Sequence, residues 1–232
     1  MKITIIRHAE PDYENDTLTA KGFKEAEFLG EYLKDEKIDF IYSSPLPRAK
    51  YTADGIVKYN NTKTYKVLDF LREFEPFMWD RLPSYLASDS RLYDRDKWLE
   101  VDFMNDPLIA KNYSLVKSEF SKLIKRHGYS KNGVYYDVFS ANHDNLVFTC
   151  HFGLGSFLLS ELLNLPVNAV VNHTCAVPSS ITTVVTEERE KGKAIFRLLS
   201  FGATPHLKAN GDTPSFMARF DEVYGDGNCN LT

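Results

Sequence analysis

Several features that would define a protein class are scarce in this chain. Only three cysteines occur, Cys150, Cys175 and Cys229, and their spacing follows no pattern. This argues against a disulfide scaffold and for a reducing compartment. No stretch approaches the roughly 20 apolar residues of a membrane-spanning helix, and the apolar run near the N-terminus is too short for a secretory signal. We therefore expect a cytoplasmic protein with no membrane partner.

An excess of basic charge is also missing. The formal net charge is −4 at pH 7, whereas a general nucleic-acid-binding protein carries a basic surface. We therefore expect no nucleic-acid partner, although a local group of arginine and histidine can still attract a small anion. The chain has 232 residues and is 43% hydrophobic and 26% charged, which is ordinary globular composition. We expect a single domain over residues 1–232.

Strand and helix patterns alternate along most of the chain. Apolar, β-branched runs predict strands at residues 2–7, 39–42, 64–68, 145–150, 181–186 and 194–201. Apolar residues at helical spacing predict helices at residues 19–33, from 48 onward, and at 156–163. Such alternation favours an α/β fold with parallel strands.

The pattern changes between residues 76 and 143. This stretch is rich in aromatic residues, Asp, Arg and Lys, with helical patterns at 93–103 and 115–127 and an Asn132-Gly133 turn signal. We interpret residues 76–143 as a largely helical insert or lid within the domain. Its many basic residues are expected to form mainly a solvated face.

Two histidines directly follow predicted strands. His8 follows the strand at residues 2–7, and His151 follows the strand at residues 145–150. Ligands of α/β sheets bind beyond the carboxyl ends of the strands. Arg7 and Arg48 add guanidinium groups that match phosphate oxygens, and a neutral imidazole can attack phosphorus. These residues predict a site for a phosphoryl group.

Six segments strengthen this interpretation because they occur in a set order. They are residues 7–11 (RHAEP), 18–22 (LTAKG), 41–53 (IYSSPLPRAKYTA), 71–73 (LRE), 147–151 (VFTCH) and 203–207 (ATPHL). Together they resemble the motifs of the histidine phosphatase superfamily, the phosphoglycerate-mutase-like proteins of branch 1. The resemblance implies a three-layer α/β sandwich whose mostly parallel central sheet is flanked by helices.

The resemblance also implies a role for each matched residue. His8 would be the nucleophile that becomes phosphohistidine, while Arg7, Arg48 and His151 would hold the phosphoryl oxygens. Glu73 would protonate the leaving group and then activate water. The implied activity is that of a phosphomonoester hydrolase acting on a phosphorylated small molecule, with no metal and no organic cofactor.

The chain departs from the family pattern at three places. Ala9 stands where the family has glycine, and Phe152 rather than glycine follows His151. The tryptophan-glutamate-glycine segment expected after the acid is absent, which leaves Glu75 as an alternative to Glu73 for the proton donor. The last segment contains His206, which is either a neighbour of the phosphate site or a structural hydrogen-bonding residue.

Other interpretations stay open at this point. One is a phosphoglycerate mutase that depends on 2,3-bisphosphoglycerate, and another is a catalytically silent phosphate- or protein-binding module. Cys150 beside His151 also admits thiol catalysis, although a cysteine at a strand end usually fills core space. The segment 142–144 (NHD) is similar to part of a metallophosphoesterase site, but no Asp-x-His pattern accompanies it. The sequence determines neither the substrate nor the oligomeric state.

Overall fold

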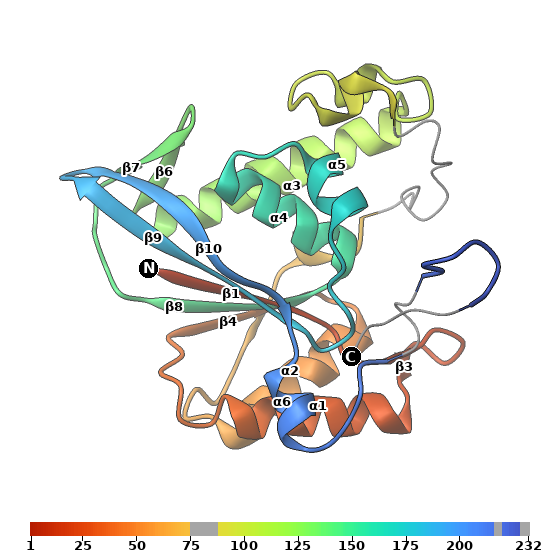
Figure 1. The fold of residues 1–232 in the computed structure, drawn as a ribbon. Helices are drawn as coiled ribbons and strands as arrows, with labels where there is room; N and C mark the ends of the chain where they lie inside the picture. Colours follow the sequence, from red (N-terminus) through yellow and green to blue (C-terminus); the bar gives the residue numbers. More distant parts are fainter. Residues whose placement is uncertain (75–87, 216–219, 228–232) are drawn as a thin grey trace.

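An eight-stranded mixed sheet forms the centre of the computed structural model (Figure 1), which describes residues 1–74, 88–215 and 220–227. The strand order is β5-β4-β8-β1-β9-β10-β7-β6. The strands are β1 (Lys2–Arg7), β4 (Phe40–Ser43), β5 (Lys66–Val67), β6 (Tyr129–Asn132), β7 (Tyr135–Val138), β8 (Asn145–Cys150), β9 (Ile181–Glu190) and β10 (Lys193–Ala203). A separate small hairpin consists of β2 (Pro11–Asp12) and β3 (Thr17–Leu18).

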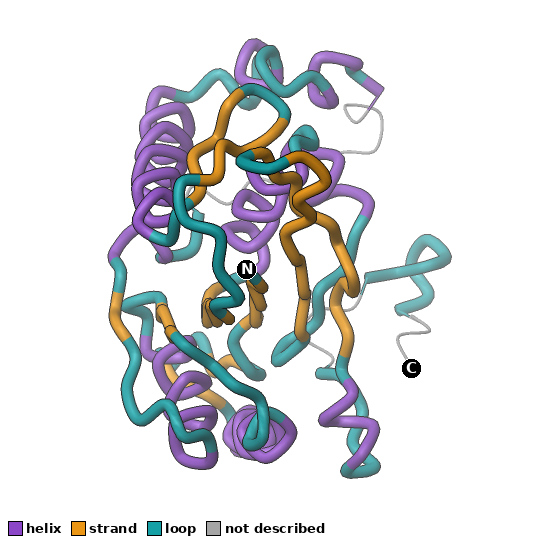
Figure 2. The backbone as a smooth tube through the Cα atoms, turned by 90° about the vertical axis from the view of Figure 1, so that its left-hand side faces the viewer, coloured by secondary structure: helices purple, strands orange, loops and turns teal. Residues whose placement is uncertain are grey.

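Helices cover both faces of this sheet. On one face lie α1 (Ala20–Tyr32), α2 (Pro47–Tyr59) and α6 (Pro205–Ala209), and on the other lie α3 (Pro107–Arg126), α4 (Phe152–Leu163) and α5 (Val167–His173). Short 3-10 helices are η1 (Asp69–Leu71), η4 (Ser90–Tyr93) and η5 (Trp98–Glu100). Figure 2 shows the strands between the two helical layers. The expected three-layer α/β sandwich is confirmed. No helix within the described ranges has the length and apolar character needed to cross a membrane.

The direction of the strands changes at β1. On one side, β5, β4, β8 and β1 run parallel. On the other side, β9, β10, β7 and β6 pair antiparallel. Tight turns explain the antiparallel half, because only residues 191–192 separate β9 from β10 and residues 133–134 separate β6 from β7. The Asn132-Gly133 turn prediction is thus confirmed, and the predicted parallel arrangement holds for the half that contains His8 and His151.

Strand β1 shows why the central strands are apolar on both sides. Ile3 and Ile5 pack into the core under α3 and α4, whereas Ile6 packs into the core against α1 and α2. Successive side chains of a strand point to opposite faces, and a strand covered on both faces is apolar throughout. This is why residues 2–6 form a strand in the middle of the sheet rather than at its edge.

Close backbone contacts place α1 relative to its neighbours. A Cβ atom on Gly30 would lie 2.1 Å from the carbonyl oxygen of Gly55, so α1 and α2 touch through their backbones. A Cβ atom on Gly22 would lie 2.2 Å from the carbonyl oxygen of Glu10. The first turn of α1, capped by Thr19 Oγ1, which accepts from the Gly22 amide, therefore rests on the loop after His8.

The insert differs in detail from its prediction. The prediction of a helix over residues 93–103 is wrong, because this part of the chain forms two separate 3-10 turns, η4 and η5. Asp94 Oδ1 accepts from the amides of Asp96 and Lys97, and such local bonds compete with a continuous helix. The helix expected over residues 115–127 begins earlier, at Pro107, where Asp106 caps it. The first part of the insert, residues 76–87, lies outside the described residues.

Candidate active site

The register of β1 and β8 brings the two histidines together. Arg7 and Cys150 are direct partners on these parallel strands, and the amide of His8 donates to the Cys150 carbonyl at 2.8 Å. His8 and His151 therefore leave the sheet side by side at its carboxyl edge. Their ring centroids are 5.1 Å apart with planes inclined by 59°, and both residues are almost completely buried.

His8 is held in a defined tautomer. Its Nδ1 lies 2.8 Å from the carbonyl oxygen of Ala9. Because a carbonyl only accepts hydrogen bonds, Nδ1 carries the proton and Nε2 presents a lone pair when the ring is neutral. Burial, and then the positive charges of Arg7 and Arg48, hold the pKa of His8 well below its usual value. The ring is thus a neutral, oriented imidazole at neutral pH.

His151 is also neutral and is oriented by a residue that the sequence analysis did not single out. His151 Nε2 lies 2.8 Å from Oγ of Ser44, whereas its buried Nδ1 has no protein partner within the described residues. Burial lowers the pKa of His151 most strongly, and the nearby His8, Arg48 and Arg7 lower it further. The available signal for Ser44 was its position, because it directly follows β4 as His8 follows β1.

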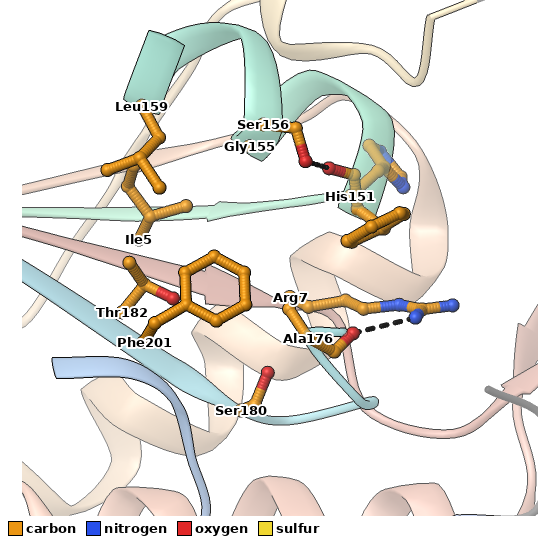
Figure 3. A pocket seen from close by; sticks show the side chains of 11 residues that line it. Ile5, Arg7, His151, Gly155, Ser156, Leu159, Ala176, Ser180, Thr182 and Phe201 are labelled. Atoms are coloured by element: carbon orange, nitrogen blue, oxygen red, sulfur yellow. Dashed lines mark hydrogen bonds between the residues drawn. The ribbon is translucent and has the colours of Figure 1, made fainter. Parts of the chain in front are cut away.

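Arg7 is anchored through one nitrogen, whereas another of its nitrogens is buried without a partner among the described residues. Its NH1 donates to the Ala176 carbonyl at 2.8 Å (Figure 3), and its guanidinium carbon lies 5.8 Å from the ring centroid of Phe152. The residue that departs from the family pattern after His151 therefore packs against Arg7. In the described part of the chain, the buried Nε of Arg7 has no partner. A cavity of about 20 Å³ adjoins Arg7, His151 and Ser180.

Arg48 belongs to the first turn of α2 and is held by the β2–β3 turn. Its guanidinium carbon lies 5.3 Å from the ring centroid of Tyr13, and its NH1 lies 3.7 Å from Asp16 Oδ1. Thr52 Oγ1 accepts from the Ala9 amide at 3.0 Å and donates to the Arg48 carbonyl at 2.8 Å. These bonds connect the start of α2 to the residue after His8.

Glu73 lies at the N-terminus of α4, on the same side of the sheet as His151. Its Oε1 accepts from the amide of Phe74 at 2.8 Å and from the amide of Leu154 at 3.0 Å. Loss of solvation raises the pKa of Glu73, and these amides and Arg7 only partly oppose that shift. A carboxyl group with a raised pKa can donate a proton. Glu75, the alternative donor, lies outside the described residues.

The remaining candidates lie away from this group or behind it. Burial raises the pKa of the Cys150 thiol, which disfavours the thiolate that nucleophilic attack requires. His143 is exposed and precedes β8, whereas His151 follows it, so the two histidines lie at opposite ends of this strand. His206 is buried, and its Nε2 lies 2.9 Å from Ser179 Oγ. Because the Ser179 amide donates to the His8 carbonyl at 3.0 Å, His206 supports the site from behind.

Metal-binding side chains do not gather anywhere in the described ranges. Among those residues, no three His, Cys, Asp or Glu side chains form a group that could hold a metal ion. The guanidinium groups of Arg7 and Arg48 bring positive charge to His8, and the N-terminus of α4 also favours anions. Two neutral imidazoles, two partly unpaired guanidiniums and a carboxyl group of raised pKa can together bind a phosphoryl group and transfer it.

Comparison with known proteins agrees with this chemistry. The model of the histidine phosphatase superfamily (branch 1) matches residues 3–197. Phosphoserine phosphatase 1 of Hydrogenobacter thermophilus is 29% identical over 140 residues, which cover 55% of this chain and 66% of that protein. An uncharacterized phosphatase, PhoE of Bacillus subtilis, is 35% identical over 77 residues, or 29% of this chain and 40% of that protein. The chain thus covers less than two thirds of the length of each of these relatives.

A solved structure supports the fold. A phosphoserine phosphatase mutant from Entamoeba histolytica, crystallised with phosphoserine, superimposes with a TM-score of 0.62 at 20% sequence identity. The superposition covers 89% of this chain and 98% of that chain. At this level of identity the likeness concerns the fold alone.

Proposed function

The chain belongs to the histidine phosphatase superfamily (branch 1), and on that basis we propose that it hydrolyses phosphomonoesters through a phosphohistidine on His8. The observation that carries the proposal is the buried, neutral pair of His8 and His151 between Arg7 and Arg48. A binding module has no need of a nucleophile whose tautomer is fixed and whose pKa is lowered. A phosphoryl-transfer enzyme needs both.

In the proposed first step, Nε2 of His8 attacks phosphorus and the bond from phosphorus to the leaving oxygen breaks. The departing alkoxide takes a proton from Glu73, whose pKa is raised by burial. Arg7, Arg48 and His151 bind the remaining phosphoryl oxygens and stabilise the charge of the transition state. Within the described residues, the buried Nε atoms of both arginines and Nδ1 of His151 have no partner, and we assign them to these bonds.

In the proposed second step, water hydrolyses the phosphohistidine. The Glu73 carboxylate left by the first step removes a proton from water, which attacks phosphorus while the bond to His8 Nε2 breaks. Inorganic phosphate leaves, and the neutral imidazole and the protonated carboxyl group are restored. Guanidinium groups and the N-terminus of α4 supply the positive charge in this scheme, and we propose that the reaction requires no metal and no organic cofactor.

The insert belongs to the same proposal. Trp98 and Leu92 of the insert share a core cluster with Phe157 of α4, the helix that begins beside His151. We propose that residues 76–143 are an insert of one domain that spans residues 1–232. Within it, residues 88–106 lie against α4 as a lid, whereas α3, β6 and β7 belong to the helical layer and the central sheet and are not part of a lid. We further propose that the substrate is a phosphorylated small molecule and that the protein is cytoplasmic, in keeping with its few cysteines.

The first test is hydrolysis of 4-nitrophenyl phosphate in excess EDTA, with the wild type beside His8→Ala. We expect wild-type turnover to survive EDTA and the variant to lose at least about a thousandfold in kcat. The matched control is His143→Ala, which removes an exposed histidine at the opposite sheet edge and should retain wild-type activity. Thermal unfolding of both variants verifies that they are folded.

A second readout distinguishes the remaining alternatives. Acid-labile phosphoenzyme, trapped from labelled substrate, should form in the wild type and not in His8→Ala. Isomerisation of phosphoglycerate that depends on 2,3-bisphosphoglycerate and exceeds hydrolysis would replace the phosphatase assignment with a mutase. Full activity in His8→Ala, or activity abolished by EDTA, would refute the proposed mechanism.

A further inference from the structure

A carboxylate lies beside the cationic site, at its solvent side. Asp16 Oδ1 is 3.7 Å from NH1 of Arg48, and 62% of the Asp16 side chain is exposed. Arg48 itself is only 12% exposed. Asp16 therefore lies between solvent and Arg48, the arginine that binds a phosphoryl oxygen in the proposed mechanism.

The turn between β2 and β3 holds Asp16 in this place. Both carboxylate oxygens of Asp12 bind Asn15, one its amide at 3.1 Å and the other its side-chain Nδ2 at 2.8 Å. Asp16 then adopts a φ of 50°, a left-handed conformation that is uncommon outside glycine. Tyr13 of the same turn packs on the Arg48 guanidinium. Two side chains of one turn thus contact the same arginine, and unusual backbone of this kind is concentrated at functional sites.

Arg48 divides its contacts between this turn and the interior. Its NH1 is next to Asp16, whereas its buried Nε has no partner in the described part of the chain. A phosphoryl group held by Arg48 lies close to Asp16, and salt screens charges only partly over distances shorter than the Debye length of about 8 Å. The dianionic phosphoryl group balances the charges of Arg7 and Arg48. Because the arginine charges are balanced in this way, they do not cancel the interaction between the Asp16 carboxylate and a further charge on the substrate.

We propose that Asp16 sets the charge preference of the site for the leaving group. It favours phosphomonoesters whose alcohol part carries an ammonium group over neutral ones, and it disfavours those with a second anionic group. The inference rests on the proposed phosphatase function and adds the substrate class to it. At a separation of about 7 Å in an environment close to water, each unit charge changes the rate about three- to eightfold.

The test compares three substrates of similar size that differ in charge. They are phosphoethanolamine, glycerol 3-phosphate and 3-phosphoglycerate, with an ammonium, a neutral and a carboxylate group on the alcohol part. The variant is Asp16→Asn, because asparagine keeps the shape and tolerates positive φ as aspartate does. The measured quantity is the ratio of kcat/KM for the ammonium substrate to that for the carboxylate substrate. We expect this ratio to fall about tenfold or more in the variant.

The ratio separates charge selection from disturbance of Arg48. A displaced Arg48 changes kcat/KM for all three substrates by the same factor and leaves the ratio unchanged. The exposed Arg72 also acts electrostatically on His151 and can contribute to the charge preference of the wild type. The test therefore rests on how much the ratio changes in Asp16→Asn and not on the ratio of the wild type itself. The matched control, Asp35→Asn, removes an equal charge from an exposed position at the other end of the strands and should keep the wild-type ratio.

The failure of this inference is distinguishable from failure of the proposed function. If the wild type hydrolyses 4-nitrophenyl phosphate and Asp16→Asn leaves the ratio unchanged, charge selection by Asp16 is refuted and the phosphatase assignment stands. Where one of the three compounds turns over too slowly, inhibition constants of the compounds against 4-nitrophenyl phosphate give a ratio of binding strengths instead, which should change in the same direction. Absence of both hydrolysis and phosphoenzyme would refute the proposed function, and this inference with it.

Discussion

The ring centroids of His8 and His151 lie 5.1 Å apart because the two residues directly follow hydrogen-bonded strands that are in register. Their spacing is therefore set by the ladder between β1 and β8 rather than by loop conformation. A sheet positions side chains more rigidly than a loop does, and phosphoryl transfer needs a fixed nucleophile. The same burial that fixes the two rings also removes them from water and lowers the pKa of both.

The first prediction concerns pH. Only the neutral form of His8 can attack, and protonation occurs as pH falls through its lowered pKa. We expect kcat to be retained between pH 7 and about pH 6, where an ordinary histidine with a pKa near 6.5 is already largely protonated. The measurement is kcat against pH, with histidine NMR to follow both rings. A half-maximal loss at pH 6.5 or above would contradict the neutral-pair assignment.

The second prediction separates Glu73 from Glu75. Glu73→Gln cannot supply a proton, so kcat for an alkyl phosphate should fall about 10²- to 10⁴-fold. With 4-nitrophenyl phosphate, whose leaving group needs no proton, the first step should survive, and phosphoenzyme should accumulate because glutamine cannot activate water in the second step. The protonated form of Glu73 disappears as pH rises through its raised pKa, so the variant should also lose the alkaline limb of the kcat–pH profile. Glu75→Gln is the matched comparison, and the reverse pattern would make Glu75 the acid.

The sequence revealed most of the candidate site because its members follow strands or begin helices. This rule and the order of the motifs were enough to place His8, His151 and Arg48. Ser44 satisfies the same rule after β4 and lies within the segment at residues 41–53, but the sequence analysis assigned it no role. Asp16 could not be predicted, because its contact with Arg48 depends on a turn whose conformation is set by local side-chain bonds.

The fold was predictable where apolar periodicity decides the structure and not where tertiary contacts do. The buried runs at residues 2–7 and 145–150 gave the central strands. β6 and β7 are short and polar, and they form because they pair with each other and with β10. Aspartate side-chain bonds replace the expected helix over residues 93–103 with two 3-10 turns, and helical spacing contains no information about such bonds.

The third prediction tests the packing of Phe152 against Arg7. Phe152→Ala removes the ring that lies 5.8 Å from the Arg7 guanidinium carbon, a contact worth about 1 kcal/mol when partly desolvated. We expect KM to rise about fivefold for every phosphomonoester, with a smaller change in kcat. Leu199→Ala, which truncates an exposed side chain on β10, is the control for general loss of apolar surface. A specific loss for large substrates alone would instead make Phe152 a wall of the substrate pocket.

The fourth prediction concerns a buried acid beneath the loop that follows His8. Glu25 is completely buried, and its Oε2 accepts from the Glu10 amide at 2.8 Å. Its Oε1 has no hydrogen-bond partner within the described residues, and Lys21 is 3.9 Å away. Burial raises the pKa of Glu25 from 4.5 to about 7. The folded protein therefore binds a proton here at a pH where the unfolded chain has released it.

This linkage fixes the sign of the effect on stability. The contribution of protonated Glu25 is fully present below pH 4.5 and is lost as pH rises through about 7. A shift of this size corresponds to about 3 kcal/mol. Because Glu25→Gln is neutral at every pH and still accepts from the Glu10 amide, we expect it to be about 1–3 kcal/mol more stable than the wild type at pH 8. At pH 5 the two proteins should be nearly equal.

Urea unfolding at both pH values measures this difference, with Glu27→Gln as the control. Glu27 lies on the same helix and forms an exposed pair with Lys58, so its removal should change the free energy of unfolding by less than about 1 kcal/mol and by a similar amount at both pH values. Lower stability of Glu25→Gln at pH 8 would show that the charged carboxylate, held by Lys21 and the Glu10 amide, stabilises the loop after His8. That result would contradict a raised pKa for Glu25, because an ionised carboxylate that stabilises the fold has a pKa lowered by its partners.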